Sequence, residues 1–274
     1  MIKRWRLWLL LLSGLVLSFL PAATNQRAST MAPTIFVHGY RGSAESLGEL
    51  MQSASNAGLA SHTLTVTVRP DGELVFSQEM TSDLPAMIQV VFQNNIAGER
   101  AYTRWLHQIY AALYQRYGYR QLNAVGHSMG AYAVVAAAML NSPIKTNKML
   151  AIAGPYNGIL HWDDEVHEVS LNKQQKPDVM RPEYKWLLAH AKNFKANSVL
   201  NLYGDVEDGS DSDTVVAANS ALSLGYVLRD SHATYRTERV LGPHAQHSLL
   251  HIHNRQVTDI MLHYLFGWKG WQHK

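Results

Sequence analysis

Short apolar runs alternate with segments of helical periodicity along most of the chain. Residues 33–37 are apolar and stop at His38-Gly39-Tyr40, which is the pattern of a buried parallel strand. Residues 99–117 instead repeat large apolar side chains at helical spacing and stop at Gly118. This alternation predicts an α/β protein with a mostly parallel central sheet, helices on both faces, and an active site beyond the carboxyl ends of the strands. The same criteria predict strands at 63–68, 74–76, 87–92, 122–125, 149–153, 198–203 and 235–241, and helices at 44–57, 129–140, 182–191, 219–228 and 257–266.

Two segments depart from the alternation. Threonine and valine alternate over residues 63–68, and Asp71-Gly72 supplies a hairpin turn before residues 74–76, which predicts a two-stranded ribbon at the edge of the sheet. Residues 155–195 are more polar and are expected to form a small cap over the pocket. The candidate walls of that pocket are Tyr156, Trp162 and Trp186.

The first 24 residues have the layout of a secretory signal. Three basic residues within the first six positions precede an uncharged, leucine-rich run from Leu7 to Leu20, and Pro21-Ala22-Ala23 follows. The run is shorter than the ~18–20 residues of a membrane-spanning helix. We therefore expect residues 1–24 to be a signal peptide or N-terminal anchor, 25–32 a linker, and 33–274 one folded domain. The protein is expected to be secreted or held at a bacterial cell surface, with membrane attachment only through the N-terminal segment.

Charge and cysteine content narrow the function classes. The chain has 24 Lys and Arg against 21 Asp and Glu, and the three basic residues at the N-terminus account for the difference. A protein that binds nucleic acid needs a basic stripe, so nucleic acid is not an expected partner. The chain has no cysteine, which excludes a thiol nucleophile, disulfides and cysteine-ligated metals.

The strongest local motif is Gly126-His127-Ser128-Met129-Gly130. It follows a predicted strand and opens directly into a predicted helix, which is the context of a nucleophile elbow. The elbow strains the serine backbone, and its two glycines let the strand and the helix pass close together. A Gly-rich turn without chemistry is the alternative interpretation. The placement favours Ser128 as a nucleophile.

A serine nucleophile needs a base and an acid that orients the base, in the chain order Ser, Asp or Glu, His. The acid is expected in the loop 204–213, where Asp213 is preferred because an apolar pair follows it, and Asp211 is the second candidate. The base is expected after the last strand, where His247 is preferred because it lies in the loop just before the terminal helix. Zinc is the competing interpretation of this region, but the spacing matches no zinc motif, and no metal is expected. The other histidines there are His244, His251 and His253.

The oxyanion formed when a serine attacks a carbonyl needs backbone N–H donors. Met129, the residue after the serine, should supply one donor, and the loop after the first strand should supply the other. In that loop Gly39 allows close approach of the backbone, so Tyr40 is the second predicted donor.

Together these motifs resemble the α/β-hydrolase superfamily, and more closely a family of secreted, surface-associated α/β-hydrolases of Gram-positive bacteria whose function is unknown. The resemblance implies a triad of Ser128, Asp213 and His247, and carboxylester hydrolysis of short acyl esters without a cofactor. The chain departs from the family pattern at Thr214, where glycine is usual, and at Ala217, where proline is usual. The matching stretches are 33–42, 71–72, 87–95, 105–117, 123–130, 212–220 and 247–254.

The predicted function is therefore that of a serine carboxylester hydrolase with a small-molecule ester as substrate. One alternative keeps the chemistry and changes the substrate, to that of a lipase, peptidase, thioesterase or acyltransferase acting on cell-envelope material. Another is a surface-binding module that keeps the fold without turnover. The sequence does not determine the oligomeric state.

Overall fold

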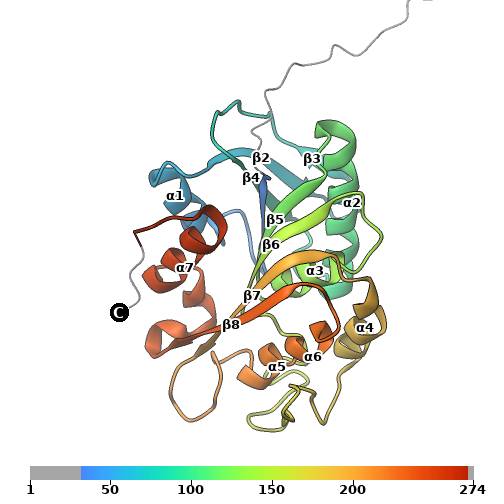
Figure 1. The fold of residues 1–274 in the computed structure, drawn as a ribbon, viewed down its shortest axis with the longest axis vertical. Helices are drawn as coiled ribbons and strands as arrows, with labels where there is room; N and C mark the ends of the chain where they lie inside the picture. The colour runs from blue at the N-terminus through green and yellow to red at the C-terminus, as the bar shows by residue number, and fades with distance from the viewer. Residues whose placement is uncertain (1–31, 271–274) are drawn as a thin grey trace, which may run out of the picture.

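In the part of the chain that the structure describes, eight strands form one central sheet (Figure 1). The computed structural model describes residues 32–270, so the predicted signal segment 1–24 and all but the last residue of the predicted linker lie outside the described residues. The strands are β1 (Thr34–Val37), β2 (Ser61–Val68), β3 (Leu74–Phe76), β4 (Ala86–Phe92), β5 (Gln121–His127), β6 (Lys145–Ile152), β7 (Ala196–Asp205) and β8 (Thr234–Leu241).

The strand order in the sheet is β3-β2-β4-β1-β5-β6-β7-β8. Only β2 and β3 pair antiparallel, and every other neighbouring pair is parallel. The predicted α/β class, with a mostly parallel sheet, is therefore confirmed, and the ribbon predicted around Asp71-Gly72 lies at one edge. Because β1 and β5 to β8 all run parallel, the loops that follow them meet at one end of the sheet.

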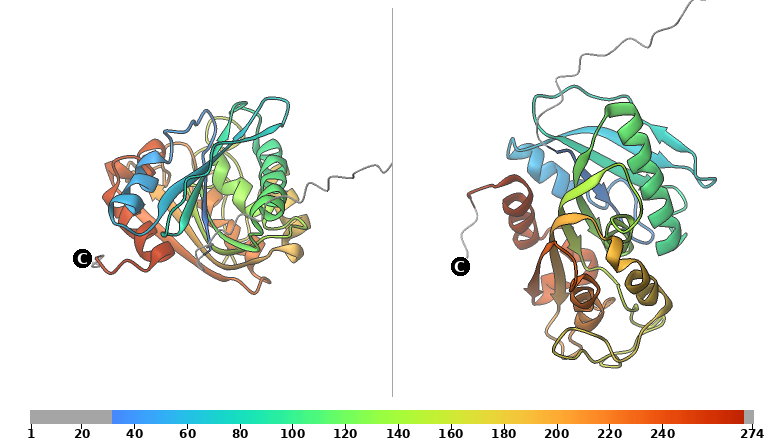
Figure 2. Two further views of the ribbon diagram at one scale, coloured as in Figure 1. Left: turned by 90° about the horizontal axis from the view of Figure 1, so that it is seen from above. Right: turned by 45° about the vertical axis from the view of Figure 1, so that its right-hand side comes forward.

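Helices cover both faces of the sheet, as Figures 1 and 2 show. The apolar residues of α1 (Gly48–Asn56) and α7 (Arg255–Phe266) form one buried cluster with one face of the strands. On the other face, a second cluster contains apolar residues of α2 (Glu99–Tyr117), α3 (Met129–Ala137), α4 (Pro182–His190) and α6 (Leu224–Leu228). Neighbouring strand residues alternate between the clusters, so that Ile35 and Val37 face the second and Phe36 faces the first.

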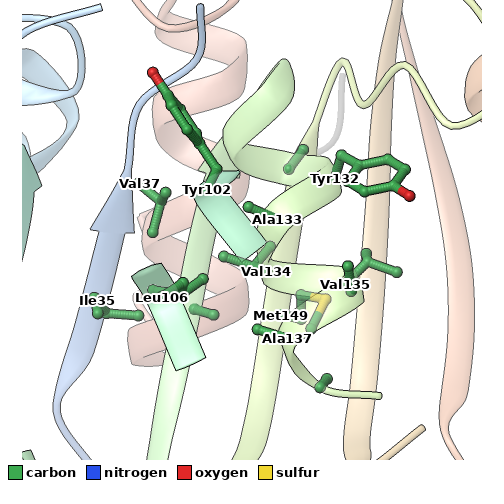
Figure 3. Packing of buried hydrophobic residues seen from close by; sticks show 14 of the residues in the cluster. Ile35, Val37, Tyr102, Leu106, Tyr132, Ala133, Val134, Val135, Ala137 and Met149 are labelled. Carbon is green, nitrogen blue, oxygen red and sulfur yellow. The ribbon is translucent and has the colours of Figure 1, made fainter. Parts of the chain in front are cut away.

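Helix α3 is the most deeply placed helix. All nine of its residues are buried, between the sheet and α2, and five of them are glycine or alanine. Figure 3 shows side chains of α2 and α3 interleaved in this layer, among them Leu106 and Val134. Small side chains let α3 approach the sheet closely, which fixes the position of its N-terminus just after β5.

The segment between β6 and β7 packs against the loop that follows β7. The Leu160 N–H donates to the Val215 carbonyl at 2.9 Å, and the Ser220 hydroxyl at the start of α5 (Ala218–Leu222) donates to the Gly158 carbonyl at 2.9 Å. Inside the segment, Arg181 pairs with the buried carboxylate of Asp164 at 3.2 Å. Figures 1 and 2 place this segment at the same end of the molecule as α5 and α6.

None of the helices between residues 32 and 270 combines the length and the hydrophobicity needed to cross a bilayer.

Candidate active site

Ser128 stands at the turn between β5 and α3 with a strained backbone. Its φ of 56° and ψ of −126° lie outside the regions that L-residues favour. The turn is held on both sides, because the Ser128 N–H donates to the Ile152 carbonyl at 2.8 Å and the Ser128 carbonyl accepts from Ala131 at 2.8 Å. The side chain is nearly buried, with 9% exposed. Backbone strain that the surroundings stabilise in this way is typical of functional residues.

The two glycines that flank the serine make this turn possible. A Cβ on Gly126 would lie 2.4 Å from the Gly130 carbonyl oxygen, and a Cβ on Gly130 would lie 2.2 Å from the Val37 carbonyl oxygen. Both separations are far below van der Waals contact, so only glycine fits at these two positions.

Asp213 and His247 are bonded to each other in the interior. Asp213 Oδ2 lies 2.7 Å from His247 Nδ1, and the two side chains are 1% and 9% exposed. The second carboxylate oxygen of Asp213 accepts from the N–H groups of Val215 and Val216, at 3.0 and 2.7 Å. Because the carboxylate accepts the bond from Nδ1–H, the lone pair of a neutral His247 is on Nε2, the position from which an imidazole acts as a base.

The second candidate acid, Asp211, lies elsewhere. Its side chain is 68% exposed and lies near His167 at 3.4 Å and Arg239 at 3.7 Å. The structure brings His247 together with Asp213 and not with Asp211.

Thr214, where the chain departs from the glycine of the family pattern, has a φ of 78°. This left-handed conformation suits glycine and is unfavourable for a β-branched residue. The strained backbone turns the next two N–H groups toward the Asp213 carboxylate.

The buried imidazole of His127 links His247 to the turn at Ser128. His127 Nε2 lies 3.0 Å from the His247 carbonyl oxygen, and the ring of His127 lies between those of His247 and His251, with centroid distances of 4.7 and 4.1 Å. Burial holds the pKa of His127 well below its usual value, and the nearby His251 and His247 lower it further. Burial likewise lowers the pKa of His251 to about 4. Both rings are therefore neutral at pH 7.

The loop after β1 lies directly against Ser128. A Cβ on Gly39 would be 2.7 Å from Ser128 Cβ and 3.3 Å from Ser128 Oγ, so the glycine backbone touches the serine. Within residues 32–270 neither the Tyr40 N–H nor the Met129 N–H donates to another protein group. These are the two N–H groups that the sequence predicts as oxyanion donors.

His38 fixes the position of this loop. Its Nε2 accepts from the Phe92 N–H at 3.0 Å, so Nδ1 carries the proton and donates to the Gly39 carbonyl at 2.8 Å. The Tyr102 hydroxyl donates to the Asn95 carbonyl at 3.0 Å and lies 3.3 Å from that of Gly39. Burial lowers the pKa of His38, which keeps the ring neutral as this bonding requires.

Of the three aromatic residues suggested as pocket walls, Trp162 alone is exposed beside this loop. Its side chain is 61% exposed and its ring stands perpendicular to that of Tyr40, with 5.1 Å between centroids. Tyr156 is fully buried in the core, and Trp186 stacks on His190 at 4.0 Å.

Two of the other histidines considered as the base lie at the surface. His244 and His253 are exposed, and His253 lies 3.2 Å from Glu49. Among residues 32–270, no three histidine or carboxylate side chains lie close enough to hold a metal ion.

Two residues of this site were missed from the sequence: His38 and His127. They stand directly beside Gly39 and Ser128, in the turn after the first strand and in the elbow motif. A polar residue at the end of a buried strand was the available signal for both. His251 was named among the histidines of the C-terminal region, but its burial against His127 has no sequence signal.

Comparison with known proteins gives a family match and several structural neighbours. A family model described as "alpha/beta hydrolase of unknown function (DUF915)" matches residues 21–268. No curated protein sequence matches the chain.

Two solved structures resemble it over most of their length. The product of the gene lin2722 of Listeria innocua is 23% identical with a TM-score of 0.77, over 89% of this chain and 96% of that protein. A candidate cell surface hydrolase of Lactobacillus plantarum is 20% identical with a TM-score of 0.65, over 86% and 92%. An esterase of Pyrococcus furiosus is more distant, at 13% identity and a TM-score of 0.50 over 87% and 84%. At these identities the likeness establishes the fold.

Proposed function

Because the chain belongs to the family of α/β-hydrolases of unknown function, we propose that it is a serine carboxylester hydrolase that acts on short-chain acyl esters through an acyl-enzyme. The observation that carries the proposal is the buried hydrogen bond between Asp213 and His247. The His247 carbonyl is in turn bonded to His127, the residue that precedes Ser128. A carboxylate that holds an imidazole in the Nδ1–H form supplies a base with a free Nε2.

In the proposed reaction, the Ser128 oxygen attacks the ester carbonyl while His247 Nε2 takes the hydroxyl proton. Asp213 stabilises the imidazolium that forms, because its carboxylate is already bonded to Nδ1. The negative oxygen of the tetrahedral intermediate accepts bonds from the N–H groups of Tyr40 and Met129. His247 then gives its proton to the departing alcohol, which leaves Ser128 acylated.

Water completes the cycle. It attacks the acyl-enzyme with His247 again as the base, the second tetrahedral intermediate collapses, and the carboxylic acid leaves as Ser128 regains its proton. Each proton moves between the substrate, water and these side chains, and the scheme uses no cofactor.

Hydrolysis of p-nitrophenyl acetate, butyrate, octanoate and palmitate by the full chain tests this function. The wild type should hydrolyse the short esters fastest. Ser128→Ala should lose that activity, whereas Ser170→Ala, which changes an exposed serine, should keep it. A fluorophosphonate probe should label the wild type on Ser128 and fail to label Ser128→Ala, as peptide mass spectrometry can establish.

The outcomes separate the alternatives. Preference for palmitate indicates a lipase, and transfer of the acyl group to an added alcohol in place of water indicates an acyltransferase. Peptide cleavage without ester cleavage indicates a peptidase. A folded protein with no turnover and no labelling of Ser128 leaves a non-catalytic surface-binding module, and activity that survives in Ser128→Ala overturns the assignment of the nucleophile.

We propose further that the protein acts outside the cytoplasm, secreted or at the cell surface. The basic start and short apolar run of residues 1–24 support this, together with the description of the Lactobacillus plantarum neighbour. Fractionation of cells that express the full chain, with and without residues 1–24, tests it. Retention of both forms in the cytoplasm would contradict export.

A further inference from the structure

His127 is buried at the centre of the site without a role in the reaction just described. It directly precedes Ser128, and 5% of it is exposed. Its ring contacts two other imidazoles, those of His247 and His251. A buried polar side chain in such a position needs a hydrogen-bond partner to offset its desolvation.

That partner is the backbone of the catalytic base. The His127 Nε2 and the His247 carbonyl oxygen are 3.0 Å apart, and because a carbonyl can only accept, Nε2 must carry the hydrogen. The bond therefore requires one tautomer of His127. It joins two residues that are 120 positions apart in the chain.

With this bond, the backbone N–H and the backbone carbonyl of His247 are both hydrogen-bonded to residues of the candidate site. The His247 N–H donates to the Asp213 carbonyl at 2.8 Å, and the His247 carbonyl accepts from His127. His247 begins η3 (His247–Leu250), a 3₁₀ helix of four residues that supplies few bonds of its own. The two contacts hold the base between its acid and the strand that carries the nucleophile.

We propose that His127 is a positioning residue, whose Nε2–H bond to the His247 carbonyl sets the distance between the base and Ser128. The inference rests on the proposed function, in which His247 is the base. Loss of the bond lets the short η3 helix shift, and a displacement of about 1 Å at a reacting group is enough to slow a reaction on the order of 100-fold.

The test compares His127→Phe, which keeps an aromatic ring and removes the donor, with His127→Gln, whose amide places a donor near the position of Nε2. For p-nitrophenyl butyrate we expect kcat to fall roughly 10- to 100-fold in His127→Phe with KM little changed, because the binding groups stay in place. His127→Gln should recover most of kcat. The matched control is His107→Phe in α2, which likewise removes an imidazole whose Nε2 lies 2.9 Å from a backbone carbonyl, that of Asn141, and leaves the His127 bond intact.

A purely structural role predicts a different pattern, in which both phenylalanine variants lose activity in proportion to their loss of folded protein. The proposal is overturned if His127→Phe, folded as shown by its melting temperature, keeps the wild-type kcat. It is also overturned if His107→Phe slows catalysis as much. If His127→Phe does not fold, His127→Asn takes its place, because its shorter amide does not reach the His247 carbonyl.

A second measurement does not depend on turnover. The proton shared by Asp213 and His247 should give a far-downfield proton NMR resonance in the wild type and in His127→Gln. In His127→Phe we expect it to be lost to solvent exchange, and its survival there would overturn the proposal. An inactive wild type would refute the proposed function alone, since this resonance still reports on positioning.

Discussion

Asp213 and His247 are joined twice, once through their side chains at 2.7 Å and once from the His247 N–H to the Asp213 carbonyl at 2.8 Å. The loop after β7 and the loop after β8 are therefore fixed to each other at the point where the proposed chemistry needs them. This double contact makes the pair more rigid than a single hydrogen bond between side chains, because the backbone bond limits how far the imidazole can move.

Replacing Asp213 and Asp211 separately distinguishes the two candidate acids. Asp213→Asn removes the charge that stabilises the imidazolium and permits the wrong tautomer of His247, so kcat for a short ester should fall roughly 10³- to 10⁴-fold. Asp211→Asn, in the same loop but on an exposed side chain, should stay within a few-fold of the wild type. Steady-state kinetics of the two variants side by side decides the assignment, and an equal loss in both would contradict it.

Thr214 is strained, and glycine should relieve the strain. At a φ of 78° a β-branched residue costs about 1–3 kcal/mol, whereas the extra freedom of glycine in the unfolded chain costs about 0.5–1 kcal/mol. Thr214→Gly should therefore raise the free energy of unfolding by about 1 kcal/mol, measured by urea denaturation. The control Thr67→Gly, in β2 with an ordinary backbone, should lower it. A loss of stability in Thr214→Gly would show that the strain is not costly.

Gly130 is required for the close approach of α3 to β1. Its added Cβ would lie 2.2 Å from the Val37 carbonyl oxygen, so Gly130→Ala should cost about 3 kcal/mol or more, or prevent folding. Gly48→Ala, at the start of α1 with no atom within 4 Å of its Cβ, should be neutral or slightly stabilising. Melting temperatures and soluble yields compare the two. Equal behaviour would argue against the packing described here.

Trp162 should influence which esters are accepted. Trp162 is exposed and contacts Tyr40 in the loop after β1, so Trp162→Ala should leave the melting temperature unchanged. It should raise KM for octanoate about five-fold, since an aromatic contact contributes about 0.5–1.5 kcal/mol. KM for acetate, which is too short to reach the ring, should stay constant. Val166→Ala, at another exposed apolar side chain of the segment, is the control, and an equal change there would refute a specific role.

Stability should fall in mildly acidic solution because of the buried histidines. The pKa of His251 is lowered from 6.5 to about 4, so between these values the unfolded chain binds a proton that the folded chain does not. The free energy of unfolding therefore keeps its full value above about pH 6.5 and decreases as the pH falls. The total decrease by about pH 4 is about 3 kcal/mol. Urea denaturation at pH 7.5 and pH 5 measures the fall. His251→Gln should make it smaller, and an unchanged dependence on pH would contradict this source.

Local sequence patterns predicted much of the fold. α2 matches its predicted bounds because its apolar spacing is regular and Gly118 adopts the left-handed conformation that ends a helix. α1 begins at Gly48, four residues later than predicted, because Ser43 and Ser46 bond to each other in a turn. β6 begins at Lys145, earlier than predicted, because its first four residues are polar and only Thr146 among them is buried, so they do not form an apolar run.

The site was only partly accessible from the sequence. Ser128 lies in a contiguous motif, whose signal is local. The choice of Asp213 over Asp211 depends on how the loop folds, and a strained Thr214 is not visible as a pattern of side chains. The contact between His127 and His247 joins residues 120 positions apart, and long-range hydrogen bonds of this kind have no sequence signature.

The order of strands also has a consequence for synthesis of the chain. Ser128 follows β5 in the middle of the sheet, whereas Asp213 and His247 follow β7 and β8, the last two strands at the far edge. A nascent chain on the ribosome, or a product truncated before β8, contains the proposed nucleophile Ser128 but lacks the proposed base His247. If the proposed triad is correct, catalytic activity should therefore appear only after nearly the whole chain has been synthesised, and incomplete chains should not hydrolyse esters.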